Sequence, residues 1–472
     1  MMIFPCRRFM LGLCCCLAAV MSLLPACAHY PVNAKLEQFN PAMHLRPRAE
    51  PPTRSPELLL IVSFSGGGTR AAALGYGVLQ TLDSVLLPSR TDEREIGEAP
   101  RHSLFDEIDL VGGVSGGSIT AAYAALKGRA VFDDFPQRFL TQNGTWQLIQ
   151  RLFNPVNWFR LASPYFNRSD IQAEYFDDIL FQGATFNDLD PAGPDLWLQA
   201  TDIIDGHYFP FSRLHFAILC SDRDRFPLAR AVAASASFPG PFGAITLRNY
   251  AGECGYQSLP AMEEVLREKD ASSRVYRLGE QMRSYLRWKD KPYVHLVDGG
   301  ISDNLGVRGY LDYFASIQDV EALLRKGGLD NVSHIAFIVA NAETKEQTKY
   351  WSLLEEAPGY SNIRDVAFSS MISGYNFETL ELLKRLVKDW SSSRQTSGAK
   401  PIEFYAIDVS FQGLSDPAER DAFLSLPTTF HLPDGTIDRL TTVAQRLLYH
   451  SPEFQRLVRN LGGSLPADDR KP

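Results

Sequence analysis

The chain has 472 residues, a formal net charge of −8 at pH 7, and a composition that is 45% hydrophobic and 22% charged. These values are typical of a globular protein that buries a large core, and the length suits one large α/β domain with insertions, or two domains. The acidic balance argues against a nucleic-acid partner, because nucleic-acid binders normally present a basic face.

Residues 1–26 have the pattern of a signal peptide. Arg7 and Arg8 form a basic region, and Phe9 to Leu24 is an uncharged apolar stretch. It closes in Leu24-Pro25-Ala26-Cys27, which resembles the lipobox of bacterial lipoproteins. That resemblance implies cleavage before Cys27 and two or more acyl chains on this residue, which would anchor the chain firmly. The alternative is an uncleaved anchor, although the stretch is shorter than the ~20 residues of a membrane-spanning helix.

A lipoprotein of this kind implies a bacterial cell envelope, with a membrane partner through the N-terminal lipid anchor. Ala28 is not an acid, so we expect the outer membrane, with the protein facing the periplasm. Apart from the signal peptide and Cys27, the chain contains two cysteines, Cys220 and Cys254. They could pair in an oxidising periplasm, and two buried free thiols are the alternative.

Residues 27–56 contain several prolines and no apolar period, which predicts a lipidated anchor and a linker. A domain is expected over residues 57–463, followed by a tail at 464–472. The domain contains six stretches with strand-like apolar patterns: Leu58–Phe64, Ile108–Val114, Leu196–Ile204, Val294–Val297, His334–Val339 and Ile402–Val409. Helical patterns lie between and after them: Thr69–Leu87, Ile119–Leu126, Ile363–Trp390 and Ile437–Leu448.

This alternation of strands and helices predicts an α/β fold, with a mostly parallel sheet covered by helices on both faces. Residues 88–103, 140–185 and 250–290 are interpreted as insertions in that plan. The segment 140–185 is rich in aromatic residues. It could be a lid or an interfacial surface for a lipid, or it could simply pack over the sheet.

The first candidate catalytic motif is Gly113-Val114-Ser115-Gly116-Gly117, which lies between a strand and a helix. A G-x-S-x-G sequence in this context holds its serine on a sharp turn that small neighbours permit, and it presents the hydroxyl at the helix N-terminus. The helix dipole and the free N–H groups there favour developing negative charge. The pattern alone is common by chance, so its strand–turn–helix context is what indicates that Ser115 is a nucleophile.

The second motif is Ser65-Gly66-Gly67-Gly68-Thr69-Arg70, again between a buried strand and a helix. Three consecutive glycines let backbone N–H groups approach a substrate oxygen, as in an oxyanion hole. A simple tight turn is one alternative. A dinucleotide-binding loop is another, since Gly66, Gly68 and Ala71 match G-x-G-x-x-A, but no second strand ending in an acid follows at the expected distance.

The third motif is Val297-Asp298-Gly299-Gly300, which closes another apolar strand. We expect both Asp298 and Ser115 at the carboxyl ends of buried strands, where a parallel sheet places its active groups. Taken alone, Asp-Gly is more often just a turn. Asp303 and Asn304 are interpreted as a cap for the next helix rather than as catalytic residues.

Together and in this order, the three motifs resemble the patatin-like phospholipase family, which is marked by G-G-G-x-R, G-x-S-x-G and D-G-[GA]. They stand here as Gly66–Arg70, Gly113–Gly117 and Asp298–Gly300. A fourth stretch, Ala234–Pro239, resembles the family's A-S-x-x-x-P segment. The resemblance runs from about residue 58 to 310 and more loosely to about 460.

This resemblance implies a three-layer patatin-like fold and a lipid acyl hydrolase of the phospholipase A or lysophospholipase type. Ser115 and Asp298 would act as a dyad through an acyl-enzyme, with the N–H groups of Gly66, Gly67 and Gly68 as the oxyanion hole. The partner would be a phospholipid or another acyl-ester lipid, and no cofactor is implied.

The role of Arg70, the last residue of the glycine-rich motif, has two interpretations. It would either orient the glycine loop or contact a lipid phosphate.

Two other readings of the same residues stay open. An ordinary α/β-hydrolase would use a Ser-Asp-His triad, and of the three histidines after Asp298 only His431, in a proline-flanked loop, is a candidate over His334 and His450. A lipid-binding lipoprotein with an inactive hydrolase fold is the second reading, and a missing Ser or Asp would mark it. No Cys/His cluster has metal-ligand spacing and no calcium loop is present, so we expect no metal.

Overall fold

The computed structural model describes residues 28–44, 54–88, 102–258, 260–315, 329–345, 353–397 and 402–465. The expected signal peptide, Cys27 and most of the expected loop at 88–103 lie outside the described residues. Within the described ranges, no helix is both long and apolar enough to cross a membrane.

In the described part of the chain, eight strands form one sheet in the order β5-β6-β3-β2-β1-β7-β8, with β4 paired to β3. The strands are β1 (Leu58–Phe64), β2 (Ile108–Gly113), β3 (Asp195–Asp202), β4 (His207–Pro210), β5 (Ile245–Arg248), β6 (Tyr293–Val297), β7 (His334–Asn341) and β8 (Glu403–Ser410). Strands β3, β2, β1, β7 and β8 run parallel to one another, whereas β4 and β6 are antiparallel to β3 and β5 is antiparallel to β6. The predicted mostly parallel sheet is therefore confirmed.

Side chains alternate between the two faces of this sheet and enter two separate cores. Leu60 and Val62 of β1 belong to the larger core, whereas Ile61 between them belongs to the smaller one. The same alternation separates Ile338 of β7 from its neighbour Phe337. Because both faces of the central strands are buried, their sequences read as nearly continuous apolar runs.

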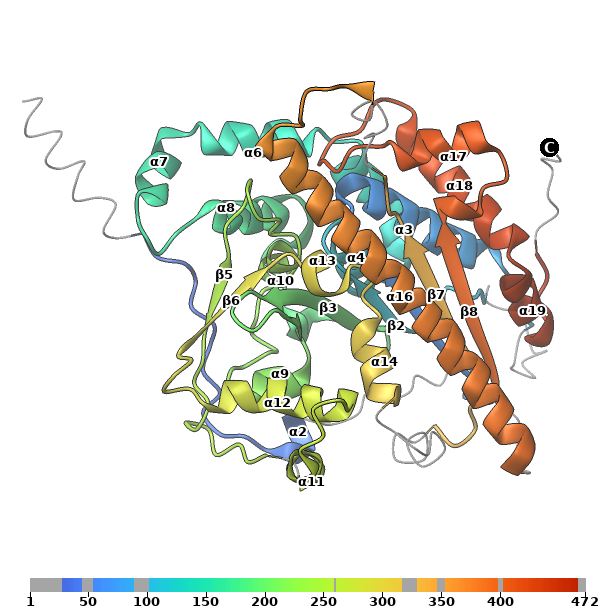
Figure 1. Cartoon of the computed structure of the whole chain (residues 1–472), viewed down its shortest axis with the longest axis horizontal. Helices are drawn as coiled ribbons and strands as arrows, with labels where there is room; N and C mark the ends of the chain where they lie inside the picture. The colour runs from blue at the N-terminus through green and yellow to red at the C-terminus, as the bar shows by residue number, and fades with distance from the viewer. Residues whose placement is uncertain are drawn as a thin grey trace, which may run out of the picture.

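Helices cover both faces, which confirms the three-layer α/β arrangement. The larger core is covered by α3 (Gly68–Ser84), α4 (Gly116–Lys127), α8 (Arg168–Phe176), α10 (Leu228–Ser235), α18 (Thr436–His450) and α19 (Pro452–Asn460). The smaller core is covered by α14 (Arg308–Ala315) and the long α16 (Tyr360–Ser397), which crosses in front of the sheet in Figure 1. The remaining helices are α2 (Pro41–His44), α5 (Val131–Phe135), α6 (Gly144–Leu152), α7 (Pro155–Leu161), α9 (Arg213–Ile218), α11 (Pro260–Glu268), α12 (Arg274–Leu286), α13 (Gly300–Asp303) and α17 (Pro417–Leu424).

The strand that precedes Asp298 does not belong to the parallel set. Strand β6, which leads to Asp298, is antiparallel to β3, so Asp298 does not follow a strand of the parallel set. The register explains how it still reaches Ser115. The last residue of β2 lies opposite Leu198, and the last residue of β6 lies opposite Thr201. If the register of β2 is continued by two residues, Ser115 lies opposite Ala200 of β3. If the register of β6 is continued by one residue, Asp298 also lies opposite Ala200, which it approaches from the other direction.

The segment 140–185 divides into buried and exposed parts. Phe166, Tyr175 and Phe176 are buried in the domain, as the packing interpretation expects. Trp146 and Trp158 are instead more than half exposed. The segment therefore combines a packed inner side with an apolar outer side.

Residues 28–40, from the expected linker, lie along the domain instead of leading away from it. Asn33 is buried, donates to the carbonyl of Arg248 over 3.0 Å, and accepts from the N–H of Arg248 over 2.7 Å. Leu36 enters the larger core. The sequence shows no apolar period here because polar backbone and amide contacts, rather than a hydrophobic face, hold this segment.

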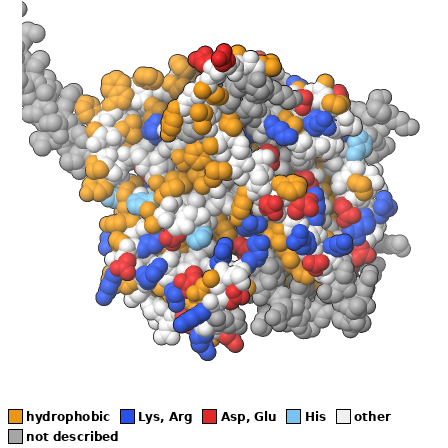
Figure 2. Space-filling model, viewed as in Figure 1, with side chains coloured by type: hydrophobic (Ala, Val, Ile, Leu, Met, Phe, Trp, Pro, Cys, Tyr) orange, Lys and Arg blue, Asp and Glu red, His pale blue; other side chains and the backbone are white. Residues whose placement is uncertain are grey.

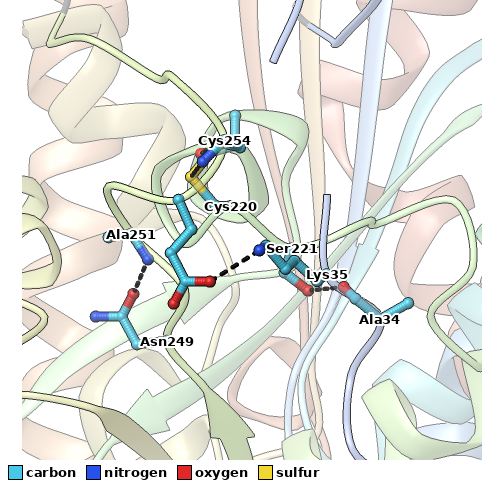
Figure 3. The surroundings of a disulfide bond; sticks show 9 residues. Ala34, Lys35, Cys220, Ser221, Asn249, Ala251 and Cys254 are labelled. Carbon is cyan, nitrogen blue, oxygen red and sulfur yellow. Dashed lines mark hydrogen bonds and ion pairs between the residues drawn. A yellow bond between two sulfur atoms is a disulfide. The ribbon is translucent and has the colours of Figure 1, made fainter. Parts of the chain in front are cut away.

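A disulfide joins Cys220 and Cys254 where this N-terminal segment crosses the domain. The backbone N–H of Leu36 donates to the carbonyl of Cys220 over 2.8 Å, and that of Phe39 donates to the carbonyl of Cys254 over 2.8 Å. Figure 3 shows Ala34 next to Ser221, the residue that directly follows Cys220, and the Ser221 hydroxyl donates to the carbonyl of Ala34 over 3.0 Å. The sequence allowed either a disulfide or two buried free thiols, and the structure contains the disulfide.

The disulfide is expected to contribute measurably to stability. It closes a loop across a sequence separation of 34 residues, and cross-linking a loop of that size restricts the unfolded chain. A Cys220→Ala/Cys254→Ala variant should therefore lose about 2–4 kcal/mol of unfolding free energy in urea. Thiol titration of the unfolded, unreduced wild-type protein is the matching control, and two reactive thiols from these positions would contradict the pairing.

Candidate active site

Ser115 sits on the turn between β2 and α4 in a backbone conformation that non-glycine residues rarely adopt, with φ 51° and ψ −121°. Close backbone packing holds this strained turn. A Cβ atom added to Gly113 would collide with the carbonyl of Gly117, and one added to Gly117 would collide with the carbonyl of Phe64. Small residues at these positions let the turn lie directly against β1, and Ser115 itself stays partly exposed.

The glycine loop between β1 and α3 packs against this turn. Gly67 has φ 142° and Gly68 has φ 60°, values that glycine adopts most readily. A Cβ on Gly116 would collide with the backbone of Gly68, and a Cβ on Gly68 would lie 2.5 Å from the carbonyl oxygen of Thr429. The two loops therefore touch backbone to backbone, next to Ser115.

Ser115 and Asp298 form a direct hydrogen bond. The Ser115 hydroxyl donates to Oδ2 of Asp298 over 2.7 Å, and Oδ1 of Asp298 accepts from the N–H of Gly300 over 2.8 Å. Asp298 is 3% exposed. Burial raises the pKa of Asp298 to about 6, although the hydrogen bonds from Ser115 and Gly300 oppose the rise. The carboxylate thus has a pKa in the range suited to a general base, and it contacts the Ser115 hydroxyl directly.

Three further hydroxyl and carbonyl groups hold this pair in position. Ser235 accepts the N–H of Ser115 over 3.0 Å and donates to the carbonyl of Gln199 over 2.7 Å. Thr201 donates to the carbonyl of Asp298 over 2.8 Å. Ser235 has no role predicted from the sequence, although it lies in Ala234–Pro239, the stretch that resembles a family segment.

The backbone N–H groups of the glycine loop are not equivalent. The N–H of Gly66 donates to the carbonyl of Asn304 over 3.0 Å, and the N–H of Thr69 donates to the carbonyl of Thr429 over 2.9 Å. No described residue accepts a hydrogen bond from the N–H of Gly67 or Gly68. These two groups lie at the N-terminus of the 17-residue helix α3, where the unpaired N–H groups and the helix dipole favour negative charge.

The two residues interpreted as a helix cap have different positions. Asp303 accepts from the N–H of Arg308, the first residue of α14, over 2.7 Å, which confirms the capping prediction. Asn304 lies instead beside the glycine loop, where a Cβ on Gly66 would collide with its side chain. The same added atom would lie 3.3 Å from the Cβ of Ser115, so Asn304 and Ser115 both border Gly66, a placement that the sequence pattern did not indicate.

Arg70 is buried in α3, and burial lowers its pKa to about 10. Its Nε donates to the carbonyl of Ala342 over 2.8 Å, and Nη1 donates to that of Leu426 over 2.8 Å. Nη2 donates to the hydroxyl of Thr428 over 3.2 Å and would lie 2.8 Å from a Cβ on Gly67. All three guanidinium nitrogens thus donate to the protein, which favours the orienting role over contact with a lipid phosphate.

The histidines lie apart from this pair. His431 is exposed, and within the described ranges no hydrogen bond links a histidine to Ser115 or Asp298. His334 contacts the hydroxyl of Tyr405 on the neighbouring strand at 3.1 Å. The described residues also contain no group of three or more His, Cys, Asp and Glu that could hold a metal ion.

A family model described as patatin-like phospholipase matches residues 62–311. This range contains both glycine-rich turns, Ser115 and Asp298. No curated protein sequence is significantly similar to this one.

Several solved structures are similar at low identity. Human GIVD cytosolic phospholipase A2 is 12% identical over 86% of this chain and 62% of that chain, with a TM-score of 0.44. VipD from Legionella pneumophila is 11% identical over 91% and 71%, with a TM-score of 0.30. ExoU of Pseudomonas aeruginosa, in its complex with SpcU, is 16% identical over 86% and 72%, with a TM-score of 0.24. The chain spans less than two thirds of the length of the human phospholipase, and similarities this distant assign no function.

The buried carboxylate predicts an unusual stability profile. Because the folded pKa of Asp298 is raised from 3.8 to about 6, folding favours its protonated form, and stability is lost as the pH rises from about 4 to above 6. An asparagine can still accept the Gly300 N–H and contact Ser115 without this cost. Asp298→Asn should therefore be more stable than wild type at pH 8 by about 1–3 kcal/mol.

Urea unfolding at pH 8 and at pH 5 measures this difference. The advantage of Asp298→Asn should be smaller at pH 5, where part of the wild-type population is already protonated. A variant that is less stable than wild type at pH 8, or equally stabilised at both pH values, would show that Asp298 does not carry a buried charge.

Proposed function

Because the chain belongs to the patatin-like phospholipase family, whose model covers residues 62–311 of its 472, we propose that it is a lipid acyl hydrolase. The reaction is that of a phospholipase A or lysophospholipase-type esterase. Ser115 is the nucleophile and Asp298 the base. The observation that carries the proposal is the 2.7 Å hydrogen bond between their side chains, placed where two glycine-rich turns meet.

In the first half-reaction the Ser115 oxygen bonds to the ester carbonyl carbon while its proton passes to Oδ2 of Asp298. The carbonyl oxygen becomes an oxyanion, which the N–H groups of Gly67 and Gly68 are placed to bind. Of the three glycines expected to form the oxyanion hole, Gly66 already donates to Asn304. Each remaining donor contributes roughly 3 kcal/mol of transition-state stabilisation, as in other acyl hydrolases. Collapse breaks the ester bond, and the leaving alcohol takes the proton from Asp298.

In the second half-reaction water attacks the acyl-enzyme on Ser115. Asp298 accepts a proton from the water as the new C–O bond forms, and it returns that proton to the Ser115 oxygen when the fatty acid leaves. A base with a pKa of about 6 is largely ionised at neutral pH and can still be protonated transiently. The dyad therefore accounts for both proton transfers without a histidine.

The two alternative readings are less well supported by the contacts. A Ser-Asp-His triad requires a histidine within hydrogen-bond reach of the serine, whereas the Ser115 hydroxyl donates to Asp298 and His431 is exposed. An inactive lipid-binding protein would not need a strained serine against a buried carboxylate. Strain and buried charge both lower stability, and such features are retained where they serve chemistry.

We further propose that the protein acts on a phospholipid or another acyl-ester lipid, as a lipoprotein of a bacterial cell envelope. The lipobox-like sequence ending at Cys27 supports a lipid anchor in the outer membrane, facing the periplasm. The disulfide between Cys220 and Cys254 supports an oxidising compartment.

The catalytic assignment predicts that Ser115 and Asp298 act as one unit. Ser115→Ala and Asp298→Asn should each lower the release of fatty acid from phospholipid vesicles by roughly 10⁴-fold or more, and the double variant should be no worse. Fatty-acid release, measured by mass spectrometry, tests this. A fluorophosphonate should label wild type at Ser115 and leave Ser115→Ala unlabelled.

His431→Ala is the matched control for the triad alternative. This variant should keep most of the activity, because His431 is exposed and makes no hydrogen bond to the pair. If His431→Ala abolishes hydrolysis while Asp298→Asn retains it, the dyad is wrong. Circular dichroism of each variant separates loss of activity from loss of folding.

The anchor predicts that the mature chain begins at a triacylated or diacylated Cys27. Mass spectrometry of the N-terminal peptide, from protein produced in a bacterial host, should show the added acyl mass. Cys27→Ser should keep residues 1–26 attached and move the protein out of the lipid-modified fraction. An unmodified Cys27 in the wild-type protein would contradict the proposal.

A further inference from the structure

Helices α6 and α7 present a group of large apolar side chains to solvent. We call this surface the α6–α7 face: Trp146, Phe153, Val156, Trp158 and Tyr165, which are 56%, 69%, 63%, 55% and 55% exposed. Soluble proteins usually expose such residues singly, whereas these five lie within 20 consecutive residues. In Figure 2 hydrophobic side chains gather at the upper left of the molecule, where Figure 1 places α6 and α7.

Several polar groups at the α6–α7 face are hydrogen-bonded within the protein. The indole N–H of Trp158 donates to the carbonyl of Leu152 over 2.8 Å. Asn143 caps α6 by accepting the N–H of Trp146, and Asn154 caps α7 by accepting the N–H of Val156. The face can therefore enter an apolar phase with these donors already paired.

The charges around this face would not repel a membrane, and binding through this face would not require anionic lipid. Residues 135–169 contain four arginines and no Asp or Glu, in a chain with a net charge of −8. Three of these arginines form ion pairs with carboxylates outside the stretch: Arg138 with Asp134, Arg151 with Asp178, and Arg160 with Glu174. Since most of the positive charge is paired, aromatic insertion rather than headgroup charge would dominate binding.

The N-terminal segment reaches the domain at the edge of this face. The hydroxyl of Ser163, directly after α7, donates to the carbonyl of Ala28 over 2.6 Å. The N–H of Tyr30 donates to the carbonyl of Tyr165 over 2.7 Å, and the ring of His29 stacks on that of Tyr165. Cys27 directly precedes Ala28 in the sequence. The lipid chains of an acylated Cys27 would therefore be attached one residue from this contact.

The same helices connect to the catalytic loops. The hydroxyl of Thr145, at the start of α6, contacts that of Thr429 at 3.0 Å. The carbonyl of Thr429 accepts the N–H of Thr69, at the beginning of α3. Two hydrogen bonds, both made by Thr429, therefore connect α6 to the start of α3, next to the glycine loop.

We infer that the α6–α7 face is a lipid-bilayer docking surface, on which Trp146, Phe153, Val156, Trp158 and Tyr165 insert into the interfacial region beside the N-terminal anchor. Tryptophan and tyrosine favour this region because their rings combine an apolar body with a polar atom. Docking holds the Ser115 site against the membrane that supplies its substrate. The inference deepens the proposed function and rests on it for that last step, whereas the contact with lipid stands on the surface itself.

A second exposed apolar group, near the start of α16, is not part of this surface. Leu353, Tyr360 and Ile363 are exposed there. Glu355 and Glu356 are exposed between them, and two carboxylates would oppose insertion into a bilayer.

Quenching of tryptophan fluorescence by brominated phosphatidylcholine tests the docking directly, with the full chain reconstituted in vesicles. Bromine on the acyl chains should quench the wild-type emission, and Trp146→Phe/Trp158→Phe should lose most of that quenching while keeping an apolar face. Trp288→Phe, at another exposed tryptophan, is the matched control and should retain it. Quenching that persists in the double variant, or that requires added anionic lipid, would overturn the inference.

An activity measurement adds a second readout. Phe153→Ser/Trp158→Ser should lower hydrolysis of vesicle phospholipid by about tenfold or more, since each aromatic ring contributes a large part of interfacial binding. Hydrolysis of a water-soluble short-chain ester should stay unchanged. Ile203→Ser/Ile204→Ser replaces two exposed apolar residues before β4 and should alter neither rate. Equal loss on both substrates in the first variant would contradict docking.

The two proposals fail in different ways. Ser115→Ala should retain the full quenching by brominated lipid, because docking needs no catalysis. If wild type hydrolyses neither substrate but is quenched through Trp146 and Trp158, the hydrolase proposal fails and the docking surface stands. If wild type hydrolyses both substrates and its fluorescence is not quenched, the docking inference fails and the hydrolase proposal stands.

Discussion

The candidate active site depends on the close backbone packing of two glycine-rich turns at the ends of neighbouring parallel strands. Gly116 lies against Gly68, and Gly117 lies against β1, at distances that leave no room for a Cβ atom. This contact holds Ser115 in its strained conformation and sets it beside the free N–H groups of the glycine loop. Arg70 supports the loop from behind through carbonyls of distant segments. The geometry of the candidate site is thus built mainly from backbone, which cannot relax as side chains do.

The second constraint is the buried carboxylate. Asp298 follows β6, which is antiparallel to the neighbouring strand β3, and its position depends on contacts with Thr201, Ser237 and Gly300. Burial makes it a stronger base than an exposed aspartate, and the same burial lowers the stability of the fold at neutral pH. The proposed role of Asp298 as a base and the stability of the fold therefore make opposite demands on this residue.

Elements far from Ser115 and Asp298 would determine how the domain is oriented on a membrane. The N-terminal segment crosses the domain beside the disulfide and reaches the edge of α7. An anchor at that end and apolar side chains on α6 and α7 would attach the protein to a membrane on the same side. Two attachments at one edge fix an orientation, whereas a flexible tether alone would leave it free.

The sequence by itself determined the strand–turn–helix context of Ser115, the glycine loop and Asp298, because apolar runs and glycine positions are local signals. It also predicted the parallel core and the Asp303 cap. Only the tertiary structure decided the antiparallel direction of β6, the contact of Ser235 with Ser115, the engagement of the Gly66 N–H by Asn304 and the pairing of Cys220 with Cys254. These depend on which segments meet after folding, over separations of 34 to more than 200 residues along the chain. No local pattern records that information.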